Sequence, residues 1–174
     1  MNYLWIDMEM SGLEVSQCRI LEVAAIITDA DFKGLESYEA IVYQEPAVLT
    51  AMDAWCTKQH GESGLTAAVA SGKPEALVEQ ELIAFIDKHF KPNERPILCG
   101  NSIGQDRKFI DAYMPDLAKR LHYRMVDVTS FKVILQDRIG SDFKKNDSHR
   151  ALGDIEESIG ELKHYLSFFA APTK

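Results

Sequence analysis

The chain has 174 residues, 46% of them hydrophobic and 26% charged, which is ordinary for a globular protein and sufficient for one domain over residues 1–174. Its net charge of −8 argues against tight binding of long nucleic acid, because grooves that track a polynucleotide usually carry a surplus of Lys and Arg. No apolar run is long enough to span a bilayer, the N-terminus lacks the basic region of a signal peptide, and the three cysteines form no CxxC pair, so we expect a cytoplasmic protein with reduced thiols and no membrane segment.

Three strands are predicted at the start of the chain. Residues 3–9 (YLWIDME) form an apolar run that ends before Ser11 and Gly12, and residues 19–28 (RILEVAAIIT) are apolar and rich in β-branched side chains. Residues 37–43 (SYEAIVY) form the third strand. Because the connections are short, these strands are expected to pair as an antiparallel meander.

Helices and two further strands are predicted after this meander. Residues 96–100 (PILCG) are expected to be a short buried strand, and residues 123–128 (YRMVDV) a fifth strand. The order of elements implies an α/β fold with a mixed five-stranded sheet flanked by helices. Helices are predicted over residues 52–60, from Pro74 onward, over residues 106–113, from Pro115, over residues 129–138 and, after a polar loop at 140–148, over residues 149–169.

Two acids, Asp7 and Glu9, interrupt the apolar run of the first strand. Side chains alternate between the faces of a strand, so these two carboxylates emerge on the same face. An isolated Asp-x-Glu on an exposed edge would mean little, but burying two unpaired carboxylates side by side is costly. A hard divalent cation offsets that cost, and the pattern therefore predicts a metal site.

Three further residues are candidates for the same site. Asp106 follows a buried strand at the mouth of a helix, where an acid could also simply interact with the helix dipole. His149 and Asp154 lie at the start of the last helix, where a surface histidine and a helix-face aspartate are the simpler explanation. Together with Asp7 and Glu9, however, they form a recurring arrangement in which metal ligands come from distant parts of a chain.

This set resembles the three motifs of the DEDD exonuclease superfamily in its histidine-bearing branch. Asp7 and Glu9 resemble the first motif, residues 101–106 the second and residues 149–154 the third. The likeness extends to oligoribonucleases, in order and over nearly the whole chain. It is carried by WIDMEMSGL (residues 5–13), CGNSIGQD (99–106), HYRMVDV (122–128) and the segment from His149 to Asp154.

The resemblance implies a ribonuclease H-like fold, a homodimer and a 3′-to-5′ exoribonuclease that hydrolyses very short RNA oligonucleotides, chiefly dinucleotides, to 5′-mononucleotides. His149 would deprotonate the attacking water, a role that suits a side chain whose ordinary pKa is near neutrality. Two cations suit the in-line displacement at phosphorus. The residues that would hold two Mg²⁺ or Mn²⁺ ions are Asp7, Glu9, Asp106 and Asp154.

The resemblance also implies a pocket for a short substrate. Leu13 would wedge against the bases and Trp55 would line the base pocket, although Trp55 could also be a core residue. His60, Ser102 and, as a weaker candidate, Gln105 would lie near the 3′ nucleotide. The 5′ phosphate would be capped by Tyr123 of the partner subunit, Arg124 and Thr129, although Arg124 could also form a surface ion pair.

One position departs from the family pattern. Gly153 stands where the family usually has an aspartate, while the adjacent Asp154 is retained. Glycine inside a helix costs about 0.5–1 kcal/mol relative to alanine, so a looser helix start is expected.

Two other functions stay open. A DNA-directed exonuclease of the same superfamily would have to hold a longer strand, which the acidic charge disfavours. A silent nucleotide-binding module would be expected to have lost metal ligands, yet the acids and the histidine are present.

Overall fold

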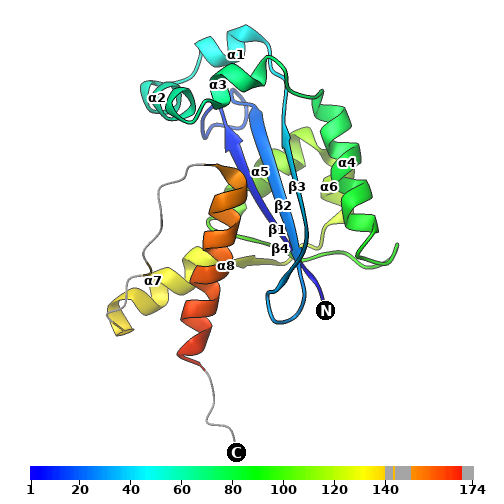
Figure 1. The fold of residues 1–174 in the computed structure, drawn as a ribbon, viewed down its shortest axis with the longest axis vertical. Coiled ribbons are helices and arrows are strands. Elements are labelled where there is room, and N and C mark those ends of the chain that lie inside the picture. Colours follow the sequence, from blue (N-terminus) through cyan, green and yellow to red (C-terminus); the bar gives the residue numbers. More distant parts are fainter. Residues whose placement is uncertain (140–142, 144–149, 170–174) are drawn as a thin grey trace, which may run out of the picture.

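A sheet of five strands runs through the middle of the molecule, with helices on both of its faces (Figure 1). This computed structural model describes residues 1–139, 143 and 150–169. The strand order is β3-β2-β1-β4-β5, so the N-terminal strand is central. The strands are β1 (Tyr3–Met10), β2 (Ile20–Thr28), β3 (Gly34–Ile41), β4 (Leu98–Gly100) and β5 (Met125–Asp127).

The pairing of the strands confirms the predicted mixed sheet. β1, β2 and β3 form the expected antiparallel meander, while β4 pairs parallel to β1 and β5 parallel to β4. β3 starts at Gly34 and not at residue 37. Its first half is largely exposed, so it lacks the apolar pattern by which a buried strand is placed.

Helices fill most of the chain between and after the strands. The short helices α1 and α3, five residues each, are absent from the sequence prediction, because five residues are too few to display a helical period. No helix in the described part of the chain is long and apolar enough to cross a membrane. The helices are α1 (Pro46–Thr50), α2 (Ala54–Glu62), α3 (Leu65–Val69), α4 (Glu75–Asp87), α5 (Gly104–Tyr113), α6 (Pro115–Arg120), α7 (Val128–Ile139) and α8 (Ala151–Ser167).

The alternation of side chains along β1 divides the core into two layers. Leu4, Ile6 and Met8 pack on the face that α4, α5 and α6 cover. Trp5 packs on the opposite face, among residues of α7 and α8. The odd-numbered positions that follow Trp5 along β1 are Asp7 and Glu9, so both acids emerge on the face that α8 covers.

The last helix begins close to the predicted position. α8 starts at Ala151, and the residue before it, Arg150, is extended. Gly153 lies within the first turn of α8, so the departure from the family pattern does not prevent the helix from forming there. The predicted loop at 140–148 lies outside the described residues except for Phe143, and so does His149.

A close approach between β4 and β1 depends on Gly100. A Cβ atom at Gly100 would lie 2.9 Å from the carbonyl oxygen of Ile6 and 2.9 Å from Cδ1 of Ile103. Both separations are shorter than real Cβ contacts, and the backbone of β1 cannot move without disturbing its pairing with β2. Glycine is therefore needed where the chain leaves the sheet for α5.

We predict that Gly100→Ala destabilises the protein by about 1–3 kcal/mol, because the added methyl group overpacks the contact between β4 and β1. Urea unfolding followed by circular dichroism measures the change. Gly104→Ala is the matched control, since a Cβ atom there meets nothing within 4 Å. Equal stabilities of the two variants would contradict the account of Gly100.

Candidate active site

Three carboxylates meet at the end of the central strand. One ligand oxygen each from Asp7, Glu9 and Asp154 lies within 4.8 Å of the other two, and all three residues are half-buried. Asp7 and Glu9 come from β1, whereas Asp154 comes from the first turn of α8. The fold thus brings together acids that are far apart in the sequence, in a group that could hold a metal ion.

The pairing of β1 with β2 fixes where the first two acids point. Asp7 lies opposite Ala24, and Glu9 lies opposite Glu22. The register of this pair shifts between Glu9 and Met10, directly after the second acid. Such irregularities re-aim side chains and recur beside active sites.

Asp106 reaches the site from the other side of β1. Its Oδ1 atom accepts a hydrogen bond of 3.0 Å from the backbone amide of Met8. That amide is available because β4 pairs with β1 only at Leu4 and Trp5 and then ends at Gly100. Asp106 is not part of the group of three carboxylates, but it lines the same cavity as Asp7 and Glu9.

Burial and mutual repulsion raise the affinity of two of these acids for protons. Burial, followed by the charges of Asp154, Glu22 and Asp106, raises the pKa of Glu9 to about 7. Burial also raises the pKa of Asp106 to about 7, although the hydrogen bond from Met8 opposes the shift. Buried carboxylates that repel one another favour a bound cation, because its positive charge stabilises their ionised forms.

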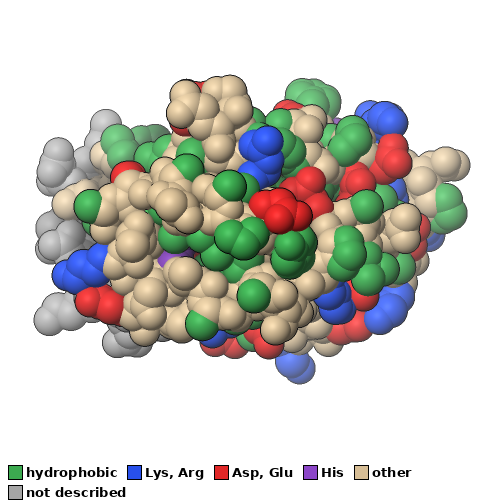
Figure 2. Space-filling view, turned by 90° about the horizontal axis from the view of Figure 1, so that it is seen from above, with side chains coloured by type: hydrophobic (Ala, Val, Ile, Leu, Met, Phe, Trp, Pro, Cys, Tyr) green, Lys and Arg blue, Asp and Glu red, His purple; other side chains and the backbone are tan. Residues whose placement is uncertain are grey.

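A cavity of about 490 Å³ opens beside the acids. Trp55 and Leu13 are 64% and 78% exposed at its rim, so Trp55 is not a core residue. Hydrophobic side chains gather across the middle of the molecular face that carries α1, α2 and α3, and on its described part the Lys and Arg side chains are scattered (Figure 2). The predicted substrate residues that line the cavity are Leu13, Trp55, His60, Ser102 and Gln105.

His60 lies at the back of this cavity and is only 2% exposed. Its Nε2 atom is 2.9 Å from the carbonyl oxygen of Met10, which can only accept, so Nε2 donates the hydrogen bond. The other ring nitrogen, Nδ1, then faces Glu9 at 3.9 Å. His60 is therefore oriented by the backbone of β1 toward the acids.

A polar network surrounds the turn that follows β4. The backbone amide of Ser102 donates to Oδ1 of Asp127 at 3.0 Å and to Oγ1 of Thr129 at 2.9 Å. These bonds hold Ser102 at a φ of 49°, in the left-handed region that a non-glycine residue rarely adopts. Asn101 donates to Oγ of Ser158 at 2.7 Å and so ties the same turn to α8. Thr129, predicted near the 5′ phosphate, thus lies directly beside Ser102.

Two predicted substrate residues lie elsewhere. Tyr123 and Arg124 precede β5, whereas the acids and Ser102 lie beyond the other end of the parallel strands. Tyr123 is 76% exposed, stacks on His122 at 4.5 Å and has the Arg124 guanidinium 5.4 Å from its ring centre. Within one chain these two residues do not line the cavity, and their roles stay predictions.

The sequence analysis missed Glu22, Arg150 and Asn101. Glu22 is a buried acid, 3% exposed, that pairs with Arg150 next to the carboxylate group. A charged residue inside the otherwise apolar run of residues 20–27 was the signal that could have identified it. Arg150 gave no such signal, because an arginine at the start of a helix is usually solvated.

Comparison with known proteins identifies the family of this chain. The RNase T exonuclease family model matches residues 4–162. An oligoribonuclease of Francisella tularensis subsp. tularensis is 48% identical over 167 residues, which cover 94% of this chain and 93% of the relative. The chain belongs to the oligoribonuclease family. An oligoribonuclease of Marinobacter nauticus is 44% identical over 171 residues, covering 95% of this chain and 94% of the relative. As a member of this family, the chain is a hydrolytic 3′-to-5′ exonuclease.

Solved structures show the same fold at low identity. Exonuclease I of Methylocaldum szegediense matches 97% of this chain with a TM-score of 0.69 and 17% identity. Exonuclease I of E. coli, solved in complex with a dT13 oligonucleotide, matches 95% of the chain with a TM-score of 0.64 and 16% identity. This chain spans only 43% and 40% of those two chains. The likeness confirms the predicted ribonuclease H-like fold.

The raised pKa values of Glu9 and Asp106 predict how stability depends on pH. Both carboxyls bind protons more tightly in the folded protein than in the unfolded chain. Their contribution to the free energy of unfolding is therefore present at low pH and is lost as the pH rises from the ordinary pKa values of these side chains toward about 7. We therefore expect Mn²⁺ to raise the melting temperature more at about pH 8 than at about pH 5, because protons no longer occupy the site.

Differential scanning fluorimetry with and without a chelator measures this effect. Glu9→Gln is the control variant, and its melting temperature should depend less on pH between these values because one of the titrating groups is gone. An Mn²⁺-induced shift of the same size at both pH values would contradict the assignment of these acids.

Proposed function

We propose that the chain is an exoribonuclease that removes 5′-mononucleotides from the 3′ ends of very short RNA oligonucleotides, chiefly dinucleotides. The observation that carries this proposal is the group of Asp7, Glu9 and Asp154 beside a cavity of about 490 Å³. That volume suits a small ligand rather than a polymer. The names of the family members point to the same class of substrate.

Two divalent cations, Mg²⁺ or Mn²⁺, are the proposed cofactors, with Asp7, Glu9, Asp106 and Asp154 as ligands. The donor set fits such ions, because it consists of carboxylate oxygens, and burial and repulsion raise the pKa of two of these acids, Glu9 and Asp106, in the absence of a cation. Bound there, the two cations would supply positive charge for the in-line displacement at phosphorus. The side chains from β1, α5 and α8 would hold these ions beside the cavity.

His149 is the proposed general base, and it lies outside the described residues. Support for it comes from its place in the third motif, immediately before Arg150, whose side chain is held against β2. A neutral imidazole accepts the proton of the attacking water and releases it near neutral pH.

The cavity offers separate surfaces for the bases and for the sugar-phosphate backbone. Trp55 and Leu13 present exposed apolar surface on which bases can stack. Gln105 supports Leu13, because its Nε2 atom donates to the Leu13 carbonyl oxygen at 2.6 Å. We propose that the polar side chains of His60 and Ser102 contact the 3′ nucleotide.

The preference for dinucleotides is attributed to a cap over the 5′ phosphate. Thr129 lies beside Ser102 and is available in the same chain. Arg124 suits a phosphate because its guanidinium can bind two oxygens at once. Since Tyr123 and Arg124 do not line the cavity of their own chain, we propose a homodimer in which Tyr123 of the partner subunit completes the site. The exposed apolar residues near β5 and on α7 that would be covered include Met125, Val133 and Ile134.

This enzyme would act in the cytoplasm as one exonuclease domain over residues 1–174. A DNA-directed activity is the alternative, favoured only by the fold shared with exonuclease I. On the face that carries α1, α2 and α3, the basic side chains of the described part are scattered and do not form a track for a longer strand.

We predict rapid release of 5′-mononucleotides from a 5′-phosphorylated diribonucleotide in the presence of Mn²⁺ or Mg²⁺, and none with a chelator. Asp154→Asn should lower kcat by at least about a hundredfold, because even changes to the partners of metal ligands cost 10–100-fold. Ion-exchange chromatography of the products measures both.

The matched control is Asp111→Asn, the same chemical change on the exposed face of α5. It should keep the activity of the unchanged protein. A metal-loaded, folded protein that cleaves a longer oligodeoxynucleotide faster than the diribonucleotide would support the DNA-directed alternative and overturn the proposal.

Mixing inactive variants tests the shared site. Tyr123→Ala keeps the acids but loses the cap, whereas Asp154→Asn keeps the cap but loses a metal ligand. If Tyr123 acts across the dimer, one site of each mixed dimer is complete, and mixing should restore activity to about a quarter of that of the unchanged protein. Activity of the mixture equal to the sum of the separate variants would contradict a site built from two subunits.

A further inference from the structure

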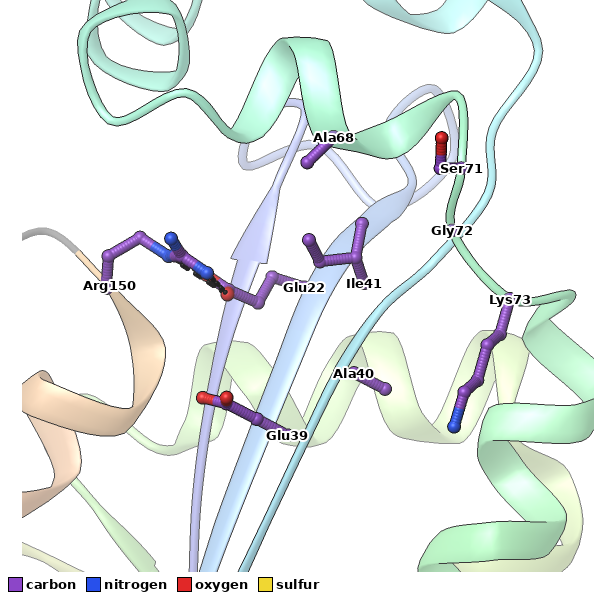
Figure 3. Close-up of a pocket in the computed structure, with 9 residues that line it drawn as sticks. All are labelled: Glu22, Glu39, Ala40, Ile41, Ala68, Ser71, Gly72, Lys73 and Arg150. Atoms are coloured by element: carbon purple, nitrogen blue, oxygen red, sulfur yellow. Dashed lines mark hydrogen bonds and ion pairs between the residues drawn. The ribbon is translucent and has the colours of Figure 1, made fainter.

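An ion pair between a buried glutamate and a half-exposed arginine lies next to the acid group. Arg150 extends from the start of α8 to Glu22 on β2, and the dashed lines in Figure 3 mark this contact. The Nη2 and Nε atoms of Arg150 donate to Oε1 of Glu22 at 2.6 and 3.0 Å, and Nε also approaches Oε2 at 3.2 Å. This forked geometry is the strong form of a charge-assisted hydrogen bond.

The two partners differ in how firmly they are fixed. Glu22 is 3% exposed and belongs to β2, which pairs with β1 on one side and with β3 on the other, so its carboxylate cannot move far. The Arg150 side chain is 45% exposed and would be free to point into solvent. The fixed Glu22 carboxylate therefore restricts the position of the Arg150 side chain.

Holding Arg150 also holds the first turn of α8. The N-cap residue of this helix, Arg150, does not cap it with its side chain. The amide of Asp154 donates to the carbonyl oxygen of Arg150 at 3.1 Å, so the backbone of Arg150 is bonded to the turn that carries the metal ligand. Across the sheet, Glu22 is the direct neighbour of Glu9. The pair thus connects the strand side of the acid group to its helix side.

We propose that Glu22 and Arg150 are positioning residues that set the distance between Asp154 and the β1 acids and so create the metal-binding geometry. The purpose of this geometry rests on the proposed function. The test of the inference does not, because cation binding can be measured without substrate. Partners of this kind, one step removed from the ligands, typically change metal affinity or activity by 10–100-fold.

A purely electrostatic role makes the opposite prediction for Arg150. Its positive charge lies close to a cation site, so removing that charge would by itself strengthen cation binding. If the pair positions α8, the same substitution must weaken binding, because the helix start loses its anchor. The sign of the change therefore distinguishes the two roles.

The experiment measures Mn²⁺ affinity by electron paramagnetic resonance, together with kcat and KM on the 5′-phosphorylated diribonucleotide. Arg150→Gln and Glu22→Gln should each weaken Mn²⁺ binding by about tenfold and lower kcat by a similar factor. KM should change little, because Trp55 and Leu13 are untouched. Arg150→Lys keeps the charge without the fork and should fall between Arg150→Gln and the unchanged protein.

Arg120→Gln is the matched control, since it removes an arginine that pairs with Asp87 and bonds to backbone carbonyls on the other side of the sheet. It should lower stability without changing Mn²⁺ affinity, which separates positioning from general loss of structure. Arg150 is half exposed, so its variants should fold even if Glu22→Gln does not.

Mn²⁺ binding by folded Arg150→Gln that equals or exceeds that of the unchanged protein would overturn the proposal. Unchanged protein that binds Mn²⁺ but does not cleave the diribonucleotide would overturn the proposed function alone, and the Mn²⁺ affinities would still decide the role of the pair. Unchanged protein that binds no Mn²⁺ would overturn both.

Discussion

The burial of mutually repelling acids at the end of β1 is the constraint that the rest of the structure has to satisfy. The carboxylates are positioned in three ways. The register of β1 against β2 positions Asp7 and Glu9, a hydrogen bond from the amide of Met8 positions Asp106, and the first turn of α8 positions Asp154. The short β4 is part of this arrangement, because a longer strand would occupy the edge of β1 that Asp106 uses. The site costs stability without a cation, and the surrounding sheet and helices supply that stability.

One strand can serve both core and site because its side chains alternate. Leu4, Ile6 and Met8 fix β1 on the layer of α4, α5 and α6, so β1 is anchored without packing contacts from Asp7 and Glu9. The opposite face is then apolar at Trp5 and acidic from Asp7 onward. The boundary between core and site on this face therefore falls between residues two positions apart.

Much of this was predictable where chemistry was encoded locally. The two-residue spacing of Asp7 and Glu9 specified a shared face, and the apolar pattern specified β1, β2 and α8 to within a few residues. Contacts between distant segments were not predictable. For example, no sequence pattern near Glu22 indicates that Arg150 is its partner. The edge strand β3 was misplaced for a related reason, since an exposed strand lacks the pattern that burial imposes. The roles of Tyr123 and His149 stay predictions, the first because its side chain lies away from the cavity of its own chain.

The scattered basic side chains on the face that carries α1, α2 and α3 affect how binding should depend on RNA length. A protein that gathers Lys and Arg along a track gains affinity with every phosphate that displaces counterions, and its binding weakens steeply in salt. Here a phosphate beyond the cavity finds no such track on the described part of the face in Figure 2 and meets a molecule with a net charge of −8. Added length then brings repulsion in place of counterion release, so discrimination against long RNA should be weakest, not strongest, at high ionic strength.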